Sequence, residues 1–371
     1  MKLSVFINNI DSTSEVFLKQ LFNELGKDIT VEIISFHYLK FKREKSNYKV
    51  RILPRRFSIL FFYAVFKTFI KYQRFEIKEL YLLSILEYAQ FKKIYFPFLY
   101  MISPFEAVLP IFLAKNKSVK VYTSIRGTEV TLDPIVKGNK IVQSYRNVIS
   151  YVYKIHFLSE KLLSQFNNLD LFHSDVEIIY QGVDRFKFYF EEVPKDSLKL
   201  ISVGRLDYIK GFEFLLLTCK KIKNTGLNFS CTIVGYGGEI HKLKYLIHDL
   251  ELHENVVILQ NVTHHELPDL LRAHNHYVHT HLVTGISNTM LEAFSCGLKV
   301  ASFSSDFESY DVDALTNFFK EVERYNVDAL ATLICENWDK NFPTLEESDF
   351  VLTKFSLNYQ RGRFLNFFGA V

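Results

Sequence analysis

The stretch LKLISVGRLDYIKG (residues 198–211) decides the fold that we expect for this 371-residue chain. Its first half is apolar and ends at Gly204, which is typical of a buried strand. After a short polar loop, residues 212–222 have the apolar spacing of a helix. A strand that leads through a glycine-containing loop into a helix is the repeating unit of a parallel α/β sheet.

A second loop-to-helix stretch, TGISNTMLEAFSCG (residues 284–297), has features of an anion site. Gly285 allows the backbone to approach a ligand closely, and Ser287 or Asn288 caps the helix that follows. The free N–H groups of a helix start favour an anion, usually a phosphate. Glu292 lies about one turn further on, near enough to accept hydrogen bonds from hydroxyls of the same ligand. An ordinary capped helix that packs on a sheet is the alternative.

Charged and glycine residues of two other loops extend this pattern. Arg205 and Lys210 project from the loop of the first stretch, where two cations can clamp a diphosphate. The stretch CTIVGYGG (residues 231–238) is again a strand that ends in glycines, at Gly235 and Gly237. Taken alone it is a weak nucleotide signal, since many strand-to-helix turns contain glycine.

In this order, the three segments resemble the C-terminal half of glycosyltransferase family 4. The resemblance implies an α/β chain of the GT-B fold, with two Rossmann-like domains whose parallel sheets face each other across a cleft. It implies a retaining, metal-independent hexosyltransferase that uses a UDP-sugar or GDP-sugar and no cofactor. Arg205 and Lys210 would be catalytic. The residues expected to bind the donor are Gly204, Gly235, Gly237, His281, Thr284, Gly285, Ser287, Asn288 and Glu292.

The first half of the chain resembles the same family more loosely. Residues 11–17 are similar to the start of bacterial members that build exopolysaccharide, capsule or related surface glycans. The resemblance therefore implies a surface glycan or a lipid-linked glycan as the acceptor. Arg126 and Glu129, which follow an expected strand at 119–124, and Ser14 in the first strand-to-helix turn are the acceptor-side candidates.

Three departures from the family pattern keep a second interpretation open. Thr284 stands where relatives usually have the first of two glutamates, residues 94–98 contain no histidine, and residues 304–307 replace a Gly-Gly loop. In relatives the missing glutamate commonly contacts the donor sugar. The alternative is a non-catalytic GT-B-like protein that binds a nucleotide or glycan during polysaccharide assembly.

Alternating strand and helix patterns predict the domain organisation. The first series of expected strands is 2–8, 30–36, 93–97, 119–124, 154–158 and 176–180, and the second is 198–203, 229–234, 255–259, 276–281 and 298–303. A polar, proline-containing segment within 187–197 predicts the hinge. We therefore expect a first domain at 1–187, a second at 188–345 and, at 346–371, a C-terminal helix that crosses back to the first.

Charge is distributed unevenly. Residues 40–80 contain 12 Lys or Arg and 3 Glu, a balance of +9, so the rest of the chain, which totals +4, carries −5. Cations alternate there with Phe and Tyr, which predicts a helix with basic ends and an apolar body. It is either a buried helix with solvated ends or one that contacts an anionic membrane. No nucleic-acid motif accompanies the patch, so we expect no nucleic-acid partner.

The remaining features indicate a cytoplasmic protein, either free or peripheral on the inner face of the cell membrane. The N-terminus lacks the pattern of a signal peptide, and no apolar run reaches the roughly 20 residues that span a bilayer. Four irregularly spaced cysteines are expected to be reduced thiols. Six of the twelve histidines lie between 264 and 281, but no cysteine or carboxylate completes a zinc spacing, so we expect no metal.

Overall fold

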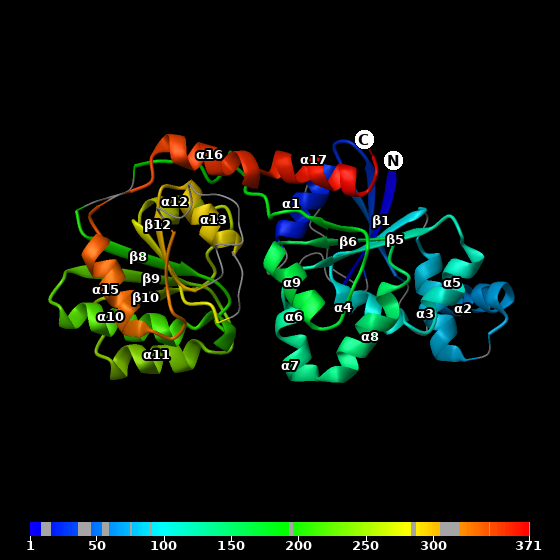
Figure 1. Ribbon diagram of the computed structural model, residues 1–371, viewed down its shortest axis with the longest axis horizontal. Helices are drawn as coiled ribbons and strands as arrows, with labels where there is room; N and C mark the ends of the chain where they lie inside the picture. Colours follow the sequence, from blue (N-terminus) through cyan, green and yellow to red (C-terminus); the bar gives the residue numbers. More distant parts are fainter. Residues whose placement is uncertain are drawn as a thin grey trace. The chain divides into compact units, whose positions relative to one another are not determined.

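The computed structural model describes residues 1–8, 16–35, 46–53, 59–74, 76–89, 91–192, 196–282, 287–304, 319–340 and 342–370. The chain forms two compact units, each built on one parallel sheet (Figure 1). The first unit comprises Met1–Tyr180 with Gln360–Val371, and the second comprises Gln181–Tyr359.

The sheet of the first unit has the strand order β3-β2-β1-β4-β5-β6-β7 among the described residues. All neighbouring strands are parallel. The order reverses between β1 and β4, which is the topological switch point of a doubly wound sheet. The strands are β1 (Lys2–Ile7), β2 (Thr30–Ser35), β3 (Tyr48–Ile52), β4 (Lys93–Phe96), β5 (Lys120–Ile125), β6 (Lys154–Phe157) and β7 (Val176–Ile178).

Helices cover this sheet, and the last of them comes from the C-terminal end of the chain. Phe367 and Phe368 of that segment contact Tyr122 at ring-centroid distances of 5.4 and 5.2 Å, so they complete the core of the first unit. The helices are α1 (Val16–Leu25), α2 (Ile59–Tyr72), α3 (Ile77–Glu87), α4 (Leu99–Ile102), α5 (Leu109–Lys115), α6 (Thr128–Thr131), α7 (Asp133–Lys137), α8 (Asn139–Ile149), α9 (Glu160–Asn168) and α17 (Leu357–Phe367).

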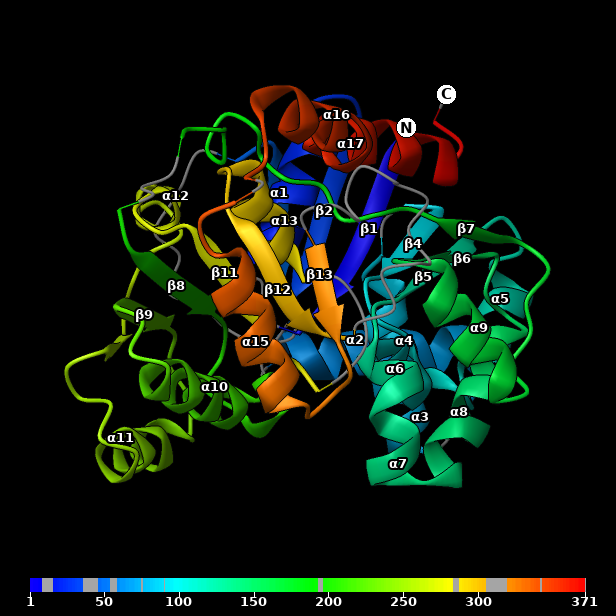
Figure 2. The same cartoon turned by 60° about the vertical axis from the view of Figure 1, so that its left-hand side comes forward.

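The second sheet repeats this topology, with the order β10-β9-β8-β11-β12-β13 among the described residues and its switch point between β8 and β11. Figure 2 shows this sheet with α10 and α11 on one side and α12 and α13 on the other. The strands are β8 (Leu198–Val203), β9 (Phe229–Val234), β10 (Val256–Leu259), β11 (His276–His279), β12 (Lys299–Phe303) and β13 (Phe319–Val322). The helices are α10 (Phe212–Asn224), α11 (Ile240–Asp249), α12 (Leu267–Arg272), α13 (Asn288–Ser295), α15 (Val327–Asn337) and α16 (Leu345–Phe355).

The boundaries between the units differ from those that the sequence predicts. The chain leaves the first unit after Tyr180, and residues 181–192 pack on the second unit. Phe188 is fully buried there, with its ring 5.3 Å from that of His264, and Arg272 contacts Glu191 at 3.4 Å. Because of these contacts, much of the segment expected to be a hinge is part of the second unit.

The C-terminal segment is two helices and not the single helix expected over 346–371. Ser356, with φ −78° and ψ 152°, interrupts it between α16 and α17. The extended residue pairs with Val183, whose N–H donates to the carbonyl of Phe355 at 2.6 Å and whose carbonyl accepts from Leu357 at 3.1 Å. α16 thus belongs to the second unit, and the chain returns to the first unit at Gln360.

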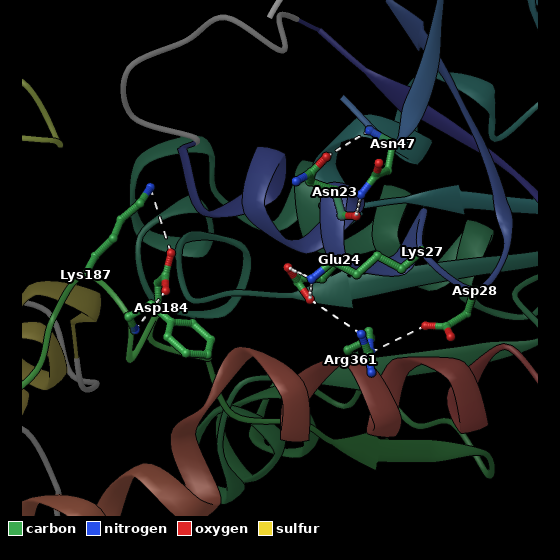
Figure 3. Close-up of polar contacts among 9 residues, drawn as sticks. Asn23, Glu24, Lys27, Asp28, Asn47, Asp184, Lys187 and Arg361 are labelled. Atoms are coloured by element: carbon green, nitrogen blue, oxygen red, sulfur yellow. Dashed lines mark hydrogen bonds and ion pairs between the residues drawn. The ribbon is translucent and has the colours of Figure 1, made fainter. Parts of the chain in front are cut away.

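Polar contacts attach α17 to the first unit. Figure 3 shows Arg361 beside Glu24 and Asp28, at 3.6 and 3.4 Å. Arg363 contacts Glu177 at 3.2 Å and donates to the carbonyl of Ile178 at 3.1 Å. Together with the aromatic packing of the same helix, these pairs hold α17 on the first unit.

The basic stretch at 40–80 contains β3, α2 and the start of α3 among its described residues. Arg55 and Arg56 lie outside them. α2 exposes much of its apolar surface, which differs from the buried helix that was one of the two expectations. No helix in the described part of the chain is both long and apolar enough to cross a bilayer.

Candidate functional site

The loop after β8 lies at the switch point of the second sheet, the usual ligand edge of such a fold. Contacts with the end of β11 hold this loop. The Thr280 hydroxyl donates to the Lys210 carbonyl at 3.1 Å, and the Leu282 N–H donates to the Ile209 carbonyl at 2.8 Å. Gly211, at φ +61°, ends the loop in a left-handed conformation, and a Cβ there would stand 2.2 Å from the Thr280 oxygen. Glycine is therefore required at this position.

The two predicted cations of the loop differ in environment. Arg205 is exposed and lies 3.4 Å from Asp207. The aliphatic part of Lys210 packs against Gly204, where a Cβ would stand 3.3 Å from its Cδ and Cε. Burial lowers the pKa of the Lys210 ammonium, while the Asp207 charge partly opposes that shift. Lys210 forms no ion pair with any described residue, so its charge is available to an anion.

Gly235 and Gly237 bring two loops together. A Cβ on Gly235 would stand 1.8 Å from the Gly204 oxygen, and one on Gly237 would stand 2.4 Å from the Leu206 oxygen. The Leu206 N–H donates to the carbonyl of Tyr236 at 2.9 Å. Besides the donor contact expected from the sequence, these glycines therefore have a packing role, because they let the loop after β9 support the loop of Arg205.

The start of α13 lies near the same edge. Ser287 caps the helix, since its hydroxyl oxygen accepts from the Met290 N–H at 3.2 Å, and Asn288 is the first helical residue. The Tyr277 hydroxyl donates to the Val203 carbonyl at 3.2 Å and thus links β11 to the end of β8. Thr284 and Gly285 lie outside the described residues.

Glu292 and His264 form a pair that the sequence does not reveal. Glu292 is buried on α13, and its Oε1 lies 3.3 Å from Nε2 of His264, which comes from the segment after β10. The ring of Phe188 packs on His264. The histidine therefore orients the carboxylate that is expected to contact the donor, although the two residues are 28 positions apart.

Two neutral histidines line the end of β11. Burial, assisted by the Lys210 charge, lowers the pKa of His279 to about 3. The pKa of His281 is also strongly lowered, first by burial and then by the charges of Lys210, His279, Arg324 and Arg205. His281, a predicted donor contact, thus lies within the field of the cations and is neutral at physiological pH.

Arg324 is a further candidate site residue that the sequence does not reveal. It follows β13 by two residues, and its charge acts on His281. Its Nη2 lies 3.5 Å from the carbonyl of Ser304, and its Nε is buried with no hydrogen-bond partner among the described residues. The only sequence signal is a basic residue after a short strand, and residues 319–322 are too polar to predict that strand.

In the first unit, Arg126 and Glu129 lie at the carboxyl end of β5. The Arg126 N–H donates to Oε2 of Glu129 at 3.2 Å, and the Arg126 Nε donates to the carbonyl of Pro97 at 3.1 Å. Glu129 is fully buried, which raises the pKa of its carboxyl group. Ser14, the third acceptor-side candidate, lies outside the described residues.

Near Arg126, a buried chain of hydrogen bonds crosses β4, β5 and β6. The Tyr95 hydroxyl lies 2.5 Å from that of Ser124, which lies 2.7 Å from Nδ1 of His156. Nε2 of His156 lies 2.8 Å from the carbonyl of Ile179 and donates to it. Burial, with help from the Arg126 charge, lowers the pKa of His156 to about 3, so the ring is neutral.

Among the described residues, the cysteines and other metal-binding residue types form no metal site. Cys219, Cys231, Cys296 and Cys335 are free thiols. In the part of the chain that the structure describes, no group of three or more His, Cys, Asp or Glu side chains is arranged to hold a metal ion.

Comparison with known proteins finds similarity mainly in the second unit. Residues 184–336 match the family model described as glycosyl transferases group 1. An uncharacterized glycosyltransferase of Methanocaldococcus jannaschii is 34% identical over 113 residues, which are 30% of this chain and 27% of that protein. The putative colanic acid biosynthesis glycosyltransferase WcaL of Escherichia coli is 27% identical over 135 residues, 34% of this chain and 33% of WcaL. The matched segments thus span well under half of these relatives.

Solved structures match over the whole chain. Sucrose-phosphate synthase from Thermosynechococcus elongatus aligns with a TM-score of 0.75 at 13% identity. HepE from Anabaena, solved with UDP and glucose, aligns with a TM-score of 0.75 at 14% identity. Both alignments cover 100% of each chain. At these identities the likeness shows the fold, which is GT-B. The chain therefore has the GT-B fold, and its residues 184–336 are similar to the glycosyl transferases of group 1.

Proposed function

We propose that the protein transfers a sugar from a nucleoside diphosphate sugar to a hydroxyl of a surface glycan or lipid-linked glycan. The observation that carries this proposal is the unpaired Lys210, held with Arg205 on a fixed loop at the switch point of the second sheet. The helix start at Ser287 and the buried carboxylate of Glu292 supply the other groups that such a donor needs. Structural neighbours solved with UDP or UDP-glucose support the choice of donor.

The proposed chemistry is stabilisation of the leaving group. As the bond from the sugar to the diphosphate breaks, negative charge accumulates on the phosphate oxygens. Arg205, Lys210 and the N–H groups at the start of α13 are placed before the reaction, so they stabilise that charge without reorganisation. The departing phosphate accepts the proton of the acceptor hydroxyl on the same face of the sugar, which retains the anomeric configuration. This route needs no protein base and no metal or other cofactor.

Ligand binding and turnover together test the transferase proposal. UDP and GDP, with their sugar conjugates, are titrated by calorimetry, and release of the nucleoside diphosphate is followed with a glycan acceptor. We expect Lys210→Ala and Arg205→Ala to lower turnover by at least about a hundredfold, as for loss of one charge partner of the transition state. Wild-type rates in both variants would contradict the assignment, and tight nucleotide binding without any turnover would favour the non-catalytic alternative.

A second part of the proposal concerns the membrane: we propose that α2 of the first unit contacts an anionic bilayer. Residues spaced three or four positions apart expose large apolar side chains along this helix, which therefore has an apolar face. The exposed fractions are 56–88% for Ile59, Leu60, Phe62, Tyr63, Phe66 and Ile70. Figure 1 shows α2 beside α3 at the edge of its unit.

The charge of this region favours a lipid surface as the partner of the apolar face. α2 contains Lys67 and Lys71 and no acidic residue, within the stretch whose balance is +9. Lys71 is paired with Glu87 at 2.7 Å, whereas Lys67 is exposed. Apolar insertion combined with attraction of about 1 kcal/mol per cation is how interfacial helices bind anionic membranes. Such contact would place the first unit at the membrane surface, where lipid-linked acceptors lie.

Vesicle flotation tests the membrane contact. We expect recovery with anionic vesicles to fall as salt rises, since the Debye length is only about 8 Å at physiological ionic strength. Phe62→Ser with Phe66→Ser should abolish recovery, and Lys67→Glu should weaken it. The matched control is Ile135→Ser with Val136→Ser, two exposed apolar residues on α7 of the same unit. Equal recovery of the α2 and α7 variants would exclude α2 as the contact.

A further inference from the structure

The guanidinium of Arg126 has unsatisfied hydrogen-bonding capacity. Its Nη1 and Nη2 are buried, and neither has a hydrogen-bond partner among the residues that the structure describes. No described carboxylate lies within ion-pair distance of it. Only the Nε is bonded, to the carbonyl of Pro97. A charged group buried without partners is costly, so this arrangement calls for an explanation.

Neighbouring groups orient the guanidinium but do not neutralise it. Its central carbon lies 4.8 Å from the ring centroid of Phe17 and 5.9 Å from that of Phe98. Aromatic faces attract a cation but accept no hydrogen bonds from its N–H groups in the plane of the fork. Glu129, three positions after Arg126, uses Oε2 for the Arg126 backbone N–H, and its buried Oε1 has no partner among the described residues.

Arg126 lies at an edge of the sheet where ligands usually bind. Arg126 follows β5 and Pro97 follows β4, so both lie at the carboxyl edge of two adjacent parallel strands, where ligands of doubly wound sheets bind. Gly127, at φ +135°, has no described atom within 4 Å of the point where a Cβ would stand. Among the described residues, the backbone next to Arg126 is therefore open on one side.

We propose that Arg126 binds an oxyanion of the acceptor, a phosphate or a carboxylate, while Oε1 of Glu129 contacts a hydroxyl of the same molecule. This inference rests on the proposed function, because it names the acceptor class of that reaction. The planar fork of arginine matches the paired oxygens of phosphate and carboxylate, and an oxyanion would satisfy both free nitrogens at once. The acceptor is thus an anionic glycan or a phosphate-linked one, and not a neutral sugar.

Thermal shift with inorganic phosphate, in the presence of saturating UDP to occupy the second unit, tests the site. We expect phosphate to raise the melting temperature of the wild-type protein. In Arg126→Gln the phosphate Kd should rise at least about tenfold, the effect of losing a charged hydrogen-bonding partner. Arg146→Gln, which alters an arginine of α8 in the same unit, is the matched control and should respond as the wild type does.

Two further readouts separate a ligand group from a structural one. Without phosphate, Arg126→Gln should melt at the same or a higher temperature, because it removes an uncompensated buried charge, whereas loss of a structural arginine would lower it. Arg126→Lys keeps the charge but not the fork, and it should bind phosphate with intermediate affinity. An unchanged phosphate response in Arg126→Gln, or a lower melting temperature with no phosphate response in any variant, would overturn the proposal.

The source of the oxyanion is distinguished with decyl phosphate and glucuronate as probes. Tighter binding of decyl phosphate indicates a phosphate-linked lipid acceptor, and tighter binding of glucuronate indicates an acidic glycan. Failure of the transferase proposal is separable, because it would appear as absence of UDP binding and turnover. The phosphate response, measured in Lys210→Ala without UDP, would still depend on Arg126.

Discussion

At the scale of single residues, the donor site depends on a few charges whose neighbours come from distant segments. Lys210 and Arg205 are recognisable in the sequence because they occupy a strand-to-helix loop of a recurring motif. His264 and Arg324 are not recognisable, because their roles arise only when β10, β11, β13 and α13 meet at one edge of the sheet. Spacing along the sequence predicts local geometry, but it does not predict which distant segments come into contact.

The first prediction concerns His264. We expect His264→Ala to raise the donor KM about tenfold with little change in kcat, because Glu292 loses the neighbour that orients it while the cations are untouched. His264→Gln retains an N–H donor and should largely restore the KM. The measurement is the steady-state kinetics of the three proteins.

A 2′-deoxy nucleoside diphosphate provides the control for this prediction. If Glu292 contacts a ribose hydroxyl, the wild-type protein discriminates against the deoxy compound, and His264→Ala should lose much of that discrimination. An identical ratio of the two dissociation constants in all three proteins would show that His264 does not act through Glu292.

At the scale of elements, strand and helix patterns predict most of the fold. The two strands that they do not predict, β3 and β13, are edge strands. Among the described residues, β3 and β13 each lie at one of the two edges of their sheets, and β7 and β10 lie at the other edges. β3 and β13 each have one neighbouring strand and carry charged residues, such as Arg51 paired with Glu32 at 2.8 Å, so neither has the apolar run of a central strand. The broken C-terminal helix was also unpredictable, because its break at Ser356 is stabilised by pairing with Val183, which lies far away in the sequence.

The second prediction concerns the paired glycine loops. Gly235→Ala places a Cβ against the Gly204 oxygen, so the loop that carries Arg205 must move. We expect a loss of about 1–3 kcal/mol in the free energy of unfolding, as for other overpacked sites, together with weaker nucleotide binding. Gly238→Ala is the matched control, because no described atom lies within 4 Å of its Cβ position. Chemical denaturation and nucleotide titration of both variants check this, and similar behaviour of the two would refute it.

At the scale of the whole molecule, buried neutral histidines make stability depend on pH. The pKa values of His156, His276 and His279 are each lowered to about 3, chiefly by burial. In the unfolded chain their pKa is about 6.5, so below that pH the unfolded state binds more protons than the folded state. Stability is therefore fully present above about pH 6.5 and is lost progressively as the pH falls toward 3.

We predict a steep fall in melting temperature below pH 6.5. Each of these histidines lowers the free energy of unfolding by on the order of 1.4 kcal/mol per pH unit in that window. By pH 5 the loss is therefore about 2 kcal/mol in the first unit, which contains His156, and about 4 kcal/mol in the second, which contains His276 and His279, against a usual net stability of about 5–15 kcal/mol. Calorimetry between pH 5 and 8 is the measurement. His276→Gln should reduce the slope, and a flat profile from pH 7 to 5 would show that these histidines titrate normally.

The return of the chain to its first unit has a consequence for biosynthesis. A ribosome makes β1 long before α17, yet Phe364, Phe367 and Phe368 fill the core around Tyr95 and Tyr122 of the early strands. During translation, the aromatic surface of the early sheet therefore stays uncovered while the second unit emerges and folds. Of the two units, the one that begins first is thus completed last, and until α17 has emerged it exposes apolar surface that favours aggregation.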